Sequence, residues 1–275
     1  MLRKIVLKLL LLSLFLCAHS ALARETGFLN RTVTVGSTTY RYQVYIPASY
    51  NPSNKLPVIL YLHGLSYRGD DGILPTEVGV GSAIRRQSES FPAIAVFPQC
   101  RLNAAWDGDM ETQAIKALDE SVKEFNGDSQ RLYLIGLSFG GYGAWYFAAH
   151  HPGKFAAVVP ISGGVFPYPN TPVSPFQPAY EAIRKSSDPY AAFARLIGKT
   201  PVWVFHGAAD LVVPVTDDRK MVEALKAIGG NVKYTEYPGR GHAHAGPLPA
   251  DTSEMEKAQT DPDFIAWLFA QRLAK

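Results

Sequence analysis

The sequence predicts one α/β domain, built on a mostly parallel twisted sheet with helices on both faces and an antiparallel hairpin at its start. Two observations lead to this prediction. Short apolar runs recur along the chain without alternating polar residues, as expected of parallel strands covered on both sides. Helical patterns lie between these runs. The hydrophobic content of 47% is enough for a single large core in a chain of this length.

The expected elements follow in order along the chain. Residues 31–35 and 38–46 alternate polar with β-branched or aromatic side chains across Gly36-Ser37, which predicts the hairpin. The apolar runs predict parallel strands at 58–62, 94–97, 132–137, 157–161, 202–205 and 232–237. Helices are expected at 79–87, 111–125, 141–150, 216–228 and 262–273.

The first 23 residues have the pattern of a secretory signal peptide. Arg3, Lys4 and Lys8 supply positive charge, residues 5–17 are almost wholly apolar, and Ala21-Leu22-Ala23 is a small-x-small cleavage site. We therefore expect cleavage after Ala23, a secreted or periplasmic protein, and a single domain over residues 24–275. No membrane span is expected once the signal is removed.

Charge and cysteine content exclude several classes of partner. Removing the signal takes away three of the 27 basic residues and none of the 24 acidic ones, so 24 of each remain. Such a balance gives no reason to expect binding to nucleic acid or to an anionic membrane. Cys100 is then the sole cysteine, so no internal disulfide can form. Metal-binding motifs are absent from the sequence, no cofactor is implied, and the sequence does not indicate an oligomeric state.

A proline-rich interval interrupts the alternation of strands and helices. Residues 166–178 hold five prolines among aromatic residues, so the interval can be neither a regular helix nor a central strand. We expect a loop or small lid near residues 164–180. It follows a strand whose end should lie near Ser138, so it forms either the rim of a substrate pocket or a plain surface excursion.

The motif Gly136-Leu137-Ser138-Phe139-Gly140 joins an expected strand to an expected helix. A turn this sharp crowds its central residue, so the positions two before and two after it need glycine. The serine hydroxyl is then held clear of the backbone, above a helix N-terminus that favours developing negative charge. We interpret Ser138 as a nucleophile. The alternative is a glycine-rich turn that happens to contain serine.

A serine nucleophile needs an imidazole to take its proton and a carboxylate to orient that imidazole. Asp210 lies in the loop directly after the expected strand 202–205 and is the candidate acid. The alternative role for an aspartate here is to cap a helix or turn. Asp217 and Asp218 fit that role better, because they lie in the first turn of the next helix.

His242 is the candidate base. It follows the tight turn at 238–241, in the loop before the last expected helix. His244 is a rival, but His242 is favoured because it comes immediately after the turn and the two side chains would point in different directions. The chain order Ser138, Asp210, His242 is that of nucleophile, acid and base in one known arrangement of the triad.

Acyl transfer also needs hydrogen-bond donors for the oxyanion. The backbone N–H of Phe139, directly after the nucleophile, is the first candidate donor. The second should come from the loop after an early parallel strand, and we assign it to the N–H of Leu65. His63, in the same loop, is expected to position the loop through hydrogen bonds and is also a candidate for substrate contact.

The chain resembles the α/β-hydrolase superfamily, in the branch of microbial esterases and predicted peptidases. Within it, the chain is similar to dienelactone hydrolase-like, polyhydroxybutyrate depolymerase-like and feruloyl esterase-like proteins. The motifs that carry the resemblance span nearly all of the chain after the signal: Leu62-His63-Gly64 with Arg68-Gly69-Asp70-Asp71, Phe97-Pro98-Gln99-Cys100, Gly136-Leu137-Ser138-Phe139-Gly140-Gly141, Phe205-His206-Gly207 with Asp210, and Tyr237-Pro238-Gly239-Arg240-Gly241-His242. The resemblance implies the α/β-hydrolase fold and a Ser-His-Asp triad.

The resemblance also suggests where substrate binds. Similar proteins place an aromatic residue near the pocket where Trp106 stands, although core packing would explain this residue equally well. The segment 68–71 would help to shape the site, or would be a solvated loop. Residues 243–247 lack the aromatic residue that often follows the base, so the acyl or alcohol preference of the family does not transfer.

These observations predict a serine carboxylic-ester hydrolase that acts through an acyl-enzyme. The expected substrates are small or aromatic acyl esters, including esters linked to polysaccharide. One alternative is a serine peptidase of the prolyl oligopeptidase type, although we expect no large N-terminal domain of the kind that restricts peptide entry in those enzymes. Another is a binding protein that keeps the hydrolase scaffold without turnover.

Overall fold

The computed structural model describes residues 25–86, 91–166, 178–242 and 262–273. The expected signal segment 1–23, most of the proline-rich interval and His244 lie outside these residues, so those expectations stay predictions. Within the described ranges, no helix is both long enough and apolar enough to cross a membrane.

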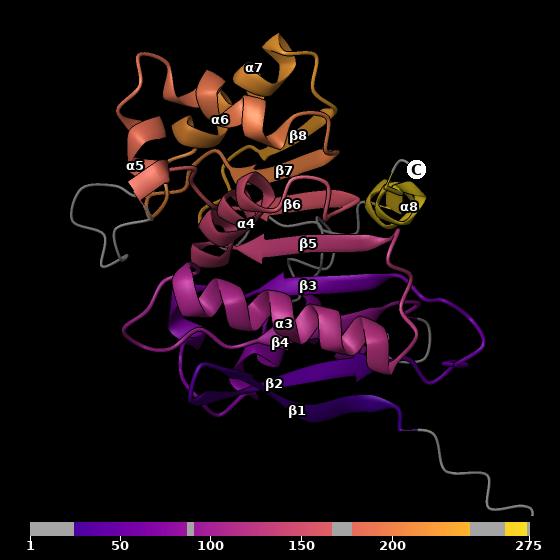
Figure 1. The fold of residues 1–275 in the computed structure, drawn as a ribbon. Helices are drawn as coiled ribbons and strands as arrows, with labels where there is room; N and C mark the ends of the chain where they lie inside the picture. Colours follow the sequence, from indigo (N-terminus) through magenta and orange to yellow (C-terminus); the bar gives the residue numbers. More distant parts are fainter. Residues whose placement is uncertain (1–24, 87–90, 167–177, 243–261, 274–275) are drawn as a thin grey trace, which may run out of the picture.

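The fold is built on an eight-stranded sheet with the strand order β1-β2-β4-β3-β5-β6-β7-β8 (Figure 1). Its first two strands form an antiparallel hairpin, β2 also runs antiparallel to β4, and the remaining neighbours are parallel. The strands are β1 (Gly27–Val35), β2 (Thr38–Ile46), β3 (Val58–Leu62), β4 (Ile94–Pro98), β5 (Leu132–Leu137), β6 (Ala157–Ile161), β7 (Val202–Gly207) and β8 (Val232–Tyr237).

Helices cover both faces of the sheet. The described helices are α2 (Val80–Arg86), α3 (Gly108–Glu124), α4 (Phe139–His150), α5 (Pro178–Arg184), α6 (Pro189–Ile197), α7 (Thr216–Ala227) and α8 (Pro262–Ala270). Two short 3₁₀ helices, η1 (Leu65–Tyr67) and η2 (Leu74–Glu77), lie between β3 and α2. In Figure 1, α3 and α4 cross the face of the sheet turned to the viewer.

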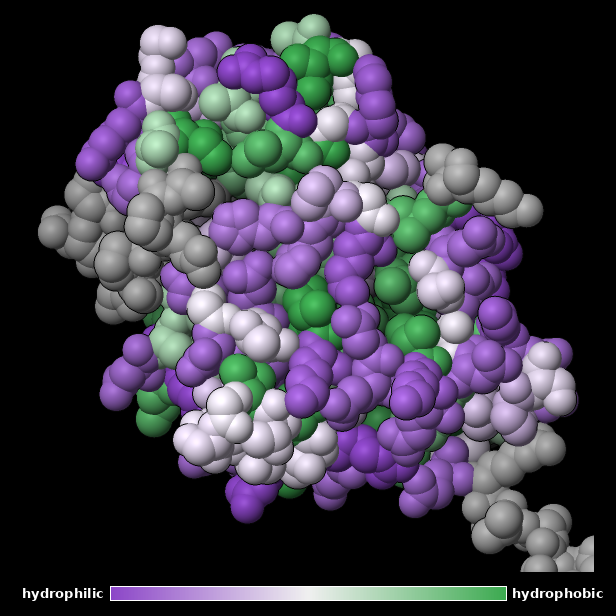
Figure 2. All heavy atoms as spheres, viewed as in Figure 1, coloured by the Kyte–Doolittle hydropathy of each residue, from purple (hydrophilic) through white to green (hydrophobic). Residues whose placement is uncertain are grey.

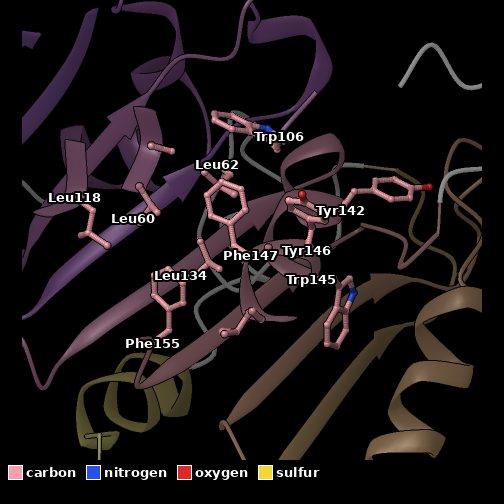
Figure 3. Packing of buried hydrophobic residues seen from close by; sticks show 14 of the residues in the cluster. Leu60, Leu62, Trp106, Leu118, Leu134, Tyr142, Trp145, Tyr146, Phe147 and Phe155 are labelled. Carbon is pink, nitrogen blue, oxygen red and sulfur yellow. The ribbon is translucent and has the colours of Figure 1, made fainter. Parts of the chain in front are cut away.

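The pleat of the strands divides the interior into two cores. Leu60 and Leu62 of β3 belong to the core under α3, α4, α6 and α7, whereas Ile59 and Tyr61 belong to the core under α2 and α8. Because successive side chains of a strand point to opposite faces, an uninterrupted apolar run fills both cores. Figure 3 shows aromatic side chains of α4, including Phe147, in the first core near Leu62.

The sequence predictions for the sheet are confirmed. Each expected strand is present, although β1 begins four residues before the predicted position, at Gly27. The helices α5 and α6 were not predicted. The start of α6 had a readable signal, because the side chain of Asp188 caps it by accepting a hydrogen bond from the N–H of Ala191, and Pro189 occupies its first turn.

The strand order places a topological switch point in the middle of the sheet. From β3 the chain continues to β4 on one side, and β5 then pairs with β3 on the other side. Ligands of open α/β sheets bind outside the carboxyl ends of the strands at such a point. The loop after β3 and the turn after β5 meet here.

The surface over the middle of the face seen in Figure 1 is mainly hydrophilic (Figure 2).

Candidate active site

The turn between β5 and α4 holds Ser138 in a strained backbone conformation. Ser138 has φ 56° and ψ −116°, and α4 begins at the next residue. A positive φ in a residue other than glycine raises the free energy of the folded state by about 1–3 kcal/mol, and such strain concentrates at functional sites. The conformation lifts the hydroxyl away from the strand, and Ser138 is partly exposed. The structure therefore has the strand-turn-helix arrangement that the sequence predicts.

The two glycines of the motif allow this turn to form. A Cβ atom on Gly136 would overlap the backbone carbonyl of Gly140, and one on Gly140 would overlap the carbonyl of Leu62. Both clashes are with backbone atoms, which cannot move aside as the end of a flexible side chain can. Any other residue at either position would force α4 away from the strands.

Three predicted site residues come together by hydrogen bonds. The Oγ of Ser138 lies 2.8 Å from Nε2 of His242, and Nδ1 of His242 lies 2.7 Å from Oδ2 of Asp210. Because a carboxylate only accepts, Nδ1 donates to Asp210 and leaves Nε2 free to accept the hydroxyl proton of Ser138. The side chain of Asp210 is fully buried, whereas that of His242 is 19% exposed. This geometry can remove a proton from the serine hydroxyl.

The loop after β7 holds Asp210 in place. Its Oδ1 accepts hydrogen bonds from the N–H groups of Val212 and Val213, both at 2.9 Å. These two bonds turn Oδ2 toward His242. A second histidine, His206, also faces this oxygen, with its Nε2 3.3 Å away. The carboxylate is therefore fixed from several directions before any substrate arrives.

Asp217 and Asp218 lie in the first turn of α7, as expected, but they do more than cap a helix. Both are buried. Asp217 accepts hydrogen bonds from the N–H of Val165 and from the hydroxyl of Tyr190, which ties α7 to the segment after β6 and to α6. Asp218 lies against His206, with its Oδ2 2.7 Å from Nδ1 of the ring.

The two candidate oxyanion donors come from the start of α4 and from the loop after β3. Phe139 is the first residue of α4, where an N–H group has no acceptor within the helix. Leu65 begins η1, and a Cβ placed on the preceding Gly64 would lie 3.6 Å from Cβ of Ser138. Neither N–H donates to another group within the described residues. Both N–H groups thus remain candidate donors for the oxyanion.

Arg68 links the residues that carry these two donors. Its Nε donates to the carbonyl of Leu65 at 3.3 Å, and its Nη1 donates to the carbonyl of Ala104 at 3.3 Å. Its guanidinium carbon lies 5.7 Å from the centre of the Phe139 ring, which is within the range of a cation–π contact. One side chain therefore connects the loop after β3 with the start of α4.

His63 and Trp106, the two tentative substrate-contact residues, lie in the interior of the structure. Both are buried, at 0% and 1% exposure. Trp106 donates from its indole N–H to the carbonyl of His63, and its ring lies 6.5 Å from that of Phe147 in the core (Figure 3). Two large side chains with no exposed surface support the loop from below. The core-packing alternative for Trp106 is the one that the structure favours.

His63 supports the loop as a neutral ring, in agreement with its expected positioning role. Its Nδ1 lies 2.8 Å from the carbonyl of Gly64, and its Nε2 accepts the N–H of Cys100 at 3.0 Å. One nitrogen must donate and the other must accept, so the ring carries a single hydrogen. Burial lowers the pKa of His63 to about 4. The neutral ring of His63 thus connects the loop after β3 with the segment that follows β4.

Sequence reasoning missed the pair formed by His206 and Asp218. His206 stands in the Phe-His-Gly segment used for the resemblance, but nothing in the sequence indicated that its ring faces both Asp210 and the next helix. A hint was present, since a histidine in an apolar strand needs buried partners and the following helix begins with two aspartates. Within the described ranges, no cluster of three or more His, Cys, Asp and Glu side chains is arranged to hold a metal ion.

Comparison with known families identifies the chain. A model described as the prolyl oligopeptidase family matches residues 101–271, which is more than half of the sequence. The chain belongs to the prolyl oligopeptidase family. The part that matches this prolyl oligopeptidase model contains Ser138, Asp210 and His242, whereas Leu65 and its loop lie before it.

Several proteins similar to this chain are named as esterases. A thermostable esterase of known structure superposes with a TM-score of 0.69 at 28% identity, covering 89% of this chain and 63% of that one. A probable feruloyl esterase C from Aspergillus terreus is 30% identical over 153 residues, covering 53% of this chain and 56% of that protein. An uncharacterized secreted protein from Arthroderma benhamiae is 29% identical over 241 residues, covering 79% and 24%.

These comparisons confirm the resemblance to α/β-hydrolase esterases and the α/β-hydrolase fold. This chain spans less than two thirds of the length of each of the three relatives.

Proposed function

We propose that this chain is a serine carboxylic-ester hydrolase that acts through an acyl-enzyme on Ser138. The observation that carries the proposal is the unbroken hydrogen-bond chain from Ser138 through His242 to Asp210. The esterases among its relatives support the same reaction class. Small or aromatic acyl esters, including esters linked to polysaccharide, are the proposed substrates.

Each residue has a role in the proposed reaction. The Oγ of Ser138 attacks the ester carbonyl carbon while its proton moves to Nε2 of His242, and the N–H groups of Leu65 and Phe139 donate to the oxyanion. The carbon–oxygen bond to the alcohol then breaks, and His242 returns the proton to that leaving group. A water attacks the acyl-enzyme by the same route, which releases the acid and restores the serine. Asp210 stabilises the imidazolium in both halves.

The test compares turnover with covalent labelling. Hydrolysis of p-nitrophenyl acetate or butyrate, without hydrolysis of peptide anilides, is expected of the wild type and should be lost in Ser138→Ala. A fluorophosphonate should label the wild type at Ser138. Ser162→Ala is a matched control, because Ser162 is a buried serine at the end of β6 with positive φ and no hydrogen-bond partner for its hydroxyl among the described residues. This control should keep both properties.

Two other results would each replace the proposal. Cleavage of peptide anilides in preference to esters would make the chain a serine peptidase, which its family membership favours as the second candidate. Absence of fluorophosphonate labelling in folded protein would make it a binding protein on a hydrolase scaffold.

We also propose export to the periplasm or the exterior. The charged and apolar pattern of residues 1–23 supports this, as does the name of the Arthroderma relative, a secreted protein.

A further inference from the structure

The side chain of His206 is fully buried, and its Nε2 atom faces only hydrogen-bond acceptors. Nε2 lies 2.9 Å from the carbonyl of Val213 and 3.3 Å from Oδ2 of Asp210. A carbonyl and a carboxylate both accept hydrogen bonds, so Nε2 carries a hydrogen. Val213 also donates its own N–H to Asp210, so His206 and the acid share one loop residue.

The other ring nitrogen requires a second proton. Nδ1 of His206 lies 2.7 Å from Oδ2 of Asp218, and Oδ1 of Asp218 accepts the indole N–H of Trp145 at 3.0 Å. Two lone pairs would repel each other at this separation, so one proton lies between Nδ1 and Oδ2. The pair is therefore either an imidazolium with a carboxylate or a neutral imidazole with a carboxylic acid.

The surroundings favour the charged ring. Burial lowers the pKa of His206, but the hydrogen bond and charge of Asp218 outweigh it and raise the pKa overall. Burial also raises the pKa of Asp218, so the pair as a whole retains its proton. Several titratable or charged groups surround the ring in the described part of the chain. They are Asp210 and His242 of the site, Asp217, Asp218 and Arg219 of α7, and Glu236 of β8. Glu236 forms an ion pair with Arg219. Acidic groups are in the majority.

We propose that His206 is a positioning residue of the site, held as an imidazolium between Asp218 and Asp210. This inference rests on the ester hydrolysis proposed above. The positive ring orients the carboxylate of Asp210 toward His242. It also places a positive charge behind that carboxylate, beside the oxygen that bonds His242.

Asp218→Asn tests the charge while keeping the hydrogen bonds. The asparagine amide can donate to Nδ1 of His206 and its carbonyl can accept from Trp145, so the ring becomes a neutral imidazole in the same place. The acid limb of kcat/KM for p-nitrophenyl acetate should move up by about one pH unit, because the positive charge behind the acid of the site is lost. The ¹⁵N resonances of His206, assigned with a His206→Gln variant, should change from imidazolium in the wild type to neutral imidazole.

Asp217→Asn is the matched control. Asp217 is the adjacent aspartate of α7 and is also buried, but it bonds Val165, Phe166 and Tyr190 instead of His206. Loss of its charge should leave the acid limb in place or move it down. An equal upward shift in both variants would overturn the proposal.

The NMR measurement separates this inference from the proposed function. A neutral His206 in wild-type protein between pH 5 and 8 would overturn the inference even if Asp218→Asn failed to fold. An imidazolium in a protein that hydrolyses no ester would support the charge state and reject the proposed function instead.

Discussion

Two fully buried histidines support opposite halves of the site, and their protonation differs. His63, after β3, supports the loop proposed to bind the oxyanion and bonds one backbone carbonyl and one backbone N–H. His206, at the end of β7, lies beside the acid and meets two carboxylates and a carbonyl. The pKa of His63 falls to about 4, whereas that of His206 rises.

Burial alone would make both rings neutral, since desolvation disfavours the charged form. The partners therefore decide the charge. His63 holds the loop after β3 by neutral bonds to the backbone, whereas His206 belongs to a network of charges in the acid half. Removing a charge next to His206 should affect mainly the acid half, and removing the hydrogen bonds of His63 or Arg68 should affect mainly the half proposed to bind the oxyanion.

The largest expected effect comes from removing the charge of Asp210. Asp210→Asn can keep the bonds from Val212 and Val213, but it no longer stabilises an imidazolium or selects the Nδ1–H form of His242. We expect kcat for p-nitrophenyl butyrate to fall by about 10⁴. The thermal unfolding midpoint shows whether the fold is retained. A loss of less than tenfold in a folded variant would contradict the charged character of the acid half.

The second prediction concerns the stability of the oxyanion half at acidic pH. The folded pKa of His63, about 4, lies below the ordinary value of 6.5, so between these values the unfolded chain binds more protons. Stability from this group is present above pH 6.5 and is lost as the pH falls toward 4, by at most about 3 kcal/mol. His63→Gln should show a flatter dependence in urea unfolding between pH 7 and 4.

His206 provides the opposite sign as a control. Its folded pKa is raised, so its stabilising contribution is present below its unfolded pKa and is lost as the pH rises through the folded value. Asp218→Asn should therefore leave the acid side of the stability curve steep and alter the alkaline side. An equally steep acid side in His63→Gln and the wild type would reject the neutral assignment of His63.

The smallest expected effect is at Arg68. Arg68→Met keeps an apolar stem but loses the bonds to Leu65 and Ala104 and the contact with the Phe139 ring. We expect kcat to fall about tenfold with KM little changed, because the loop donor is held less well. Arg85→Met is the control, since Arg85 lies over Phe28 and bonds Glu77, away from the site loops. An equal effect in both variants would indicate a general loss of stability.

Most of the sheet could be predicted from the sequence, because short uninterrupted apolar runs between helical patterns are typical of strands buried on both faces. The positions of Ser138, Asp210 and His242 were also predictable, since each follows an expected strand and parallel strands end at one edge of the sheet. Their catalytic role stays a prediction until turnover is measured.

The burial of Trp106 and the contact between His206 and Asp218 were not predicted, because they depend on packing that sequence patterns do not encode. The burial of Trp106 results from the close approach of α4, where a Cβ on Gly143 would come within 2.8 Å of the Trp106 side chain. The partnership of His206 with Asp218 depends on the angle at which α7 returns to β7. Neither property can be read from spacing, because both depend on how the elements pack against each other in space.

The burial of the Cys100 thiol affects its chemical reactivity. The thiol is fully buried at the end of β4, and burial raises its pKa to about 12. Only a thiolate at the surface reacts readily with oxidants or with another thiol. In the folded chain this thiol therefore resists oxidation by peroxide and cross-linking to another molecule, even where the surroundings are oxidising.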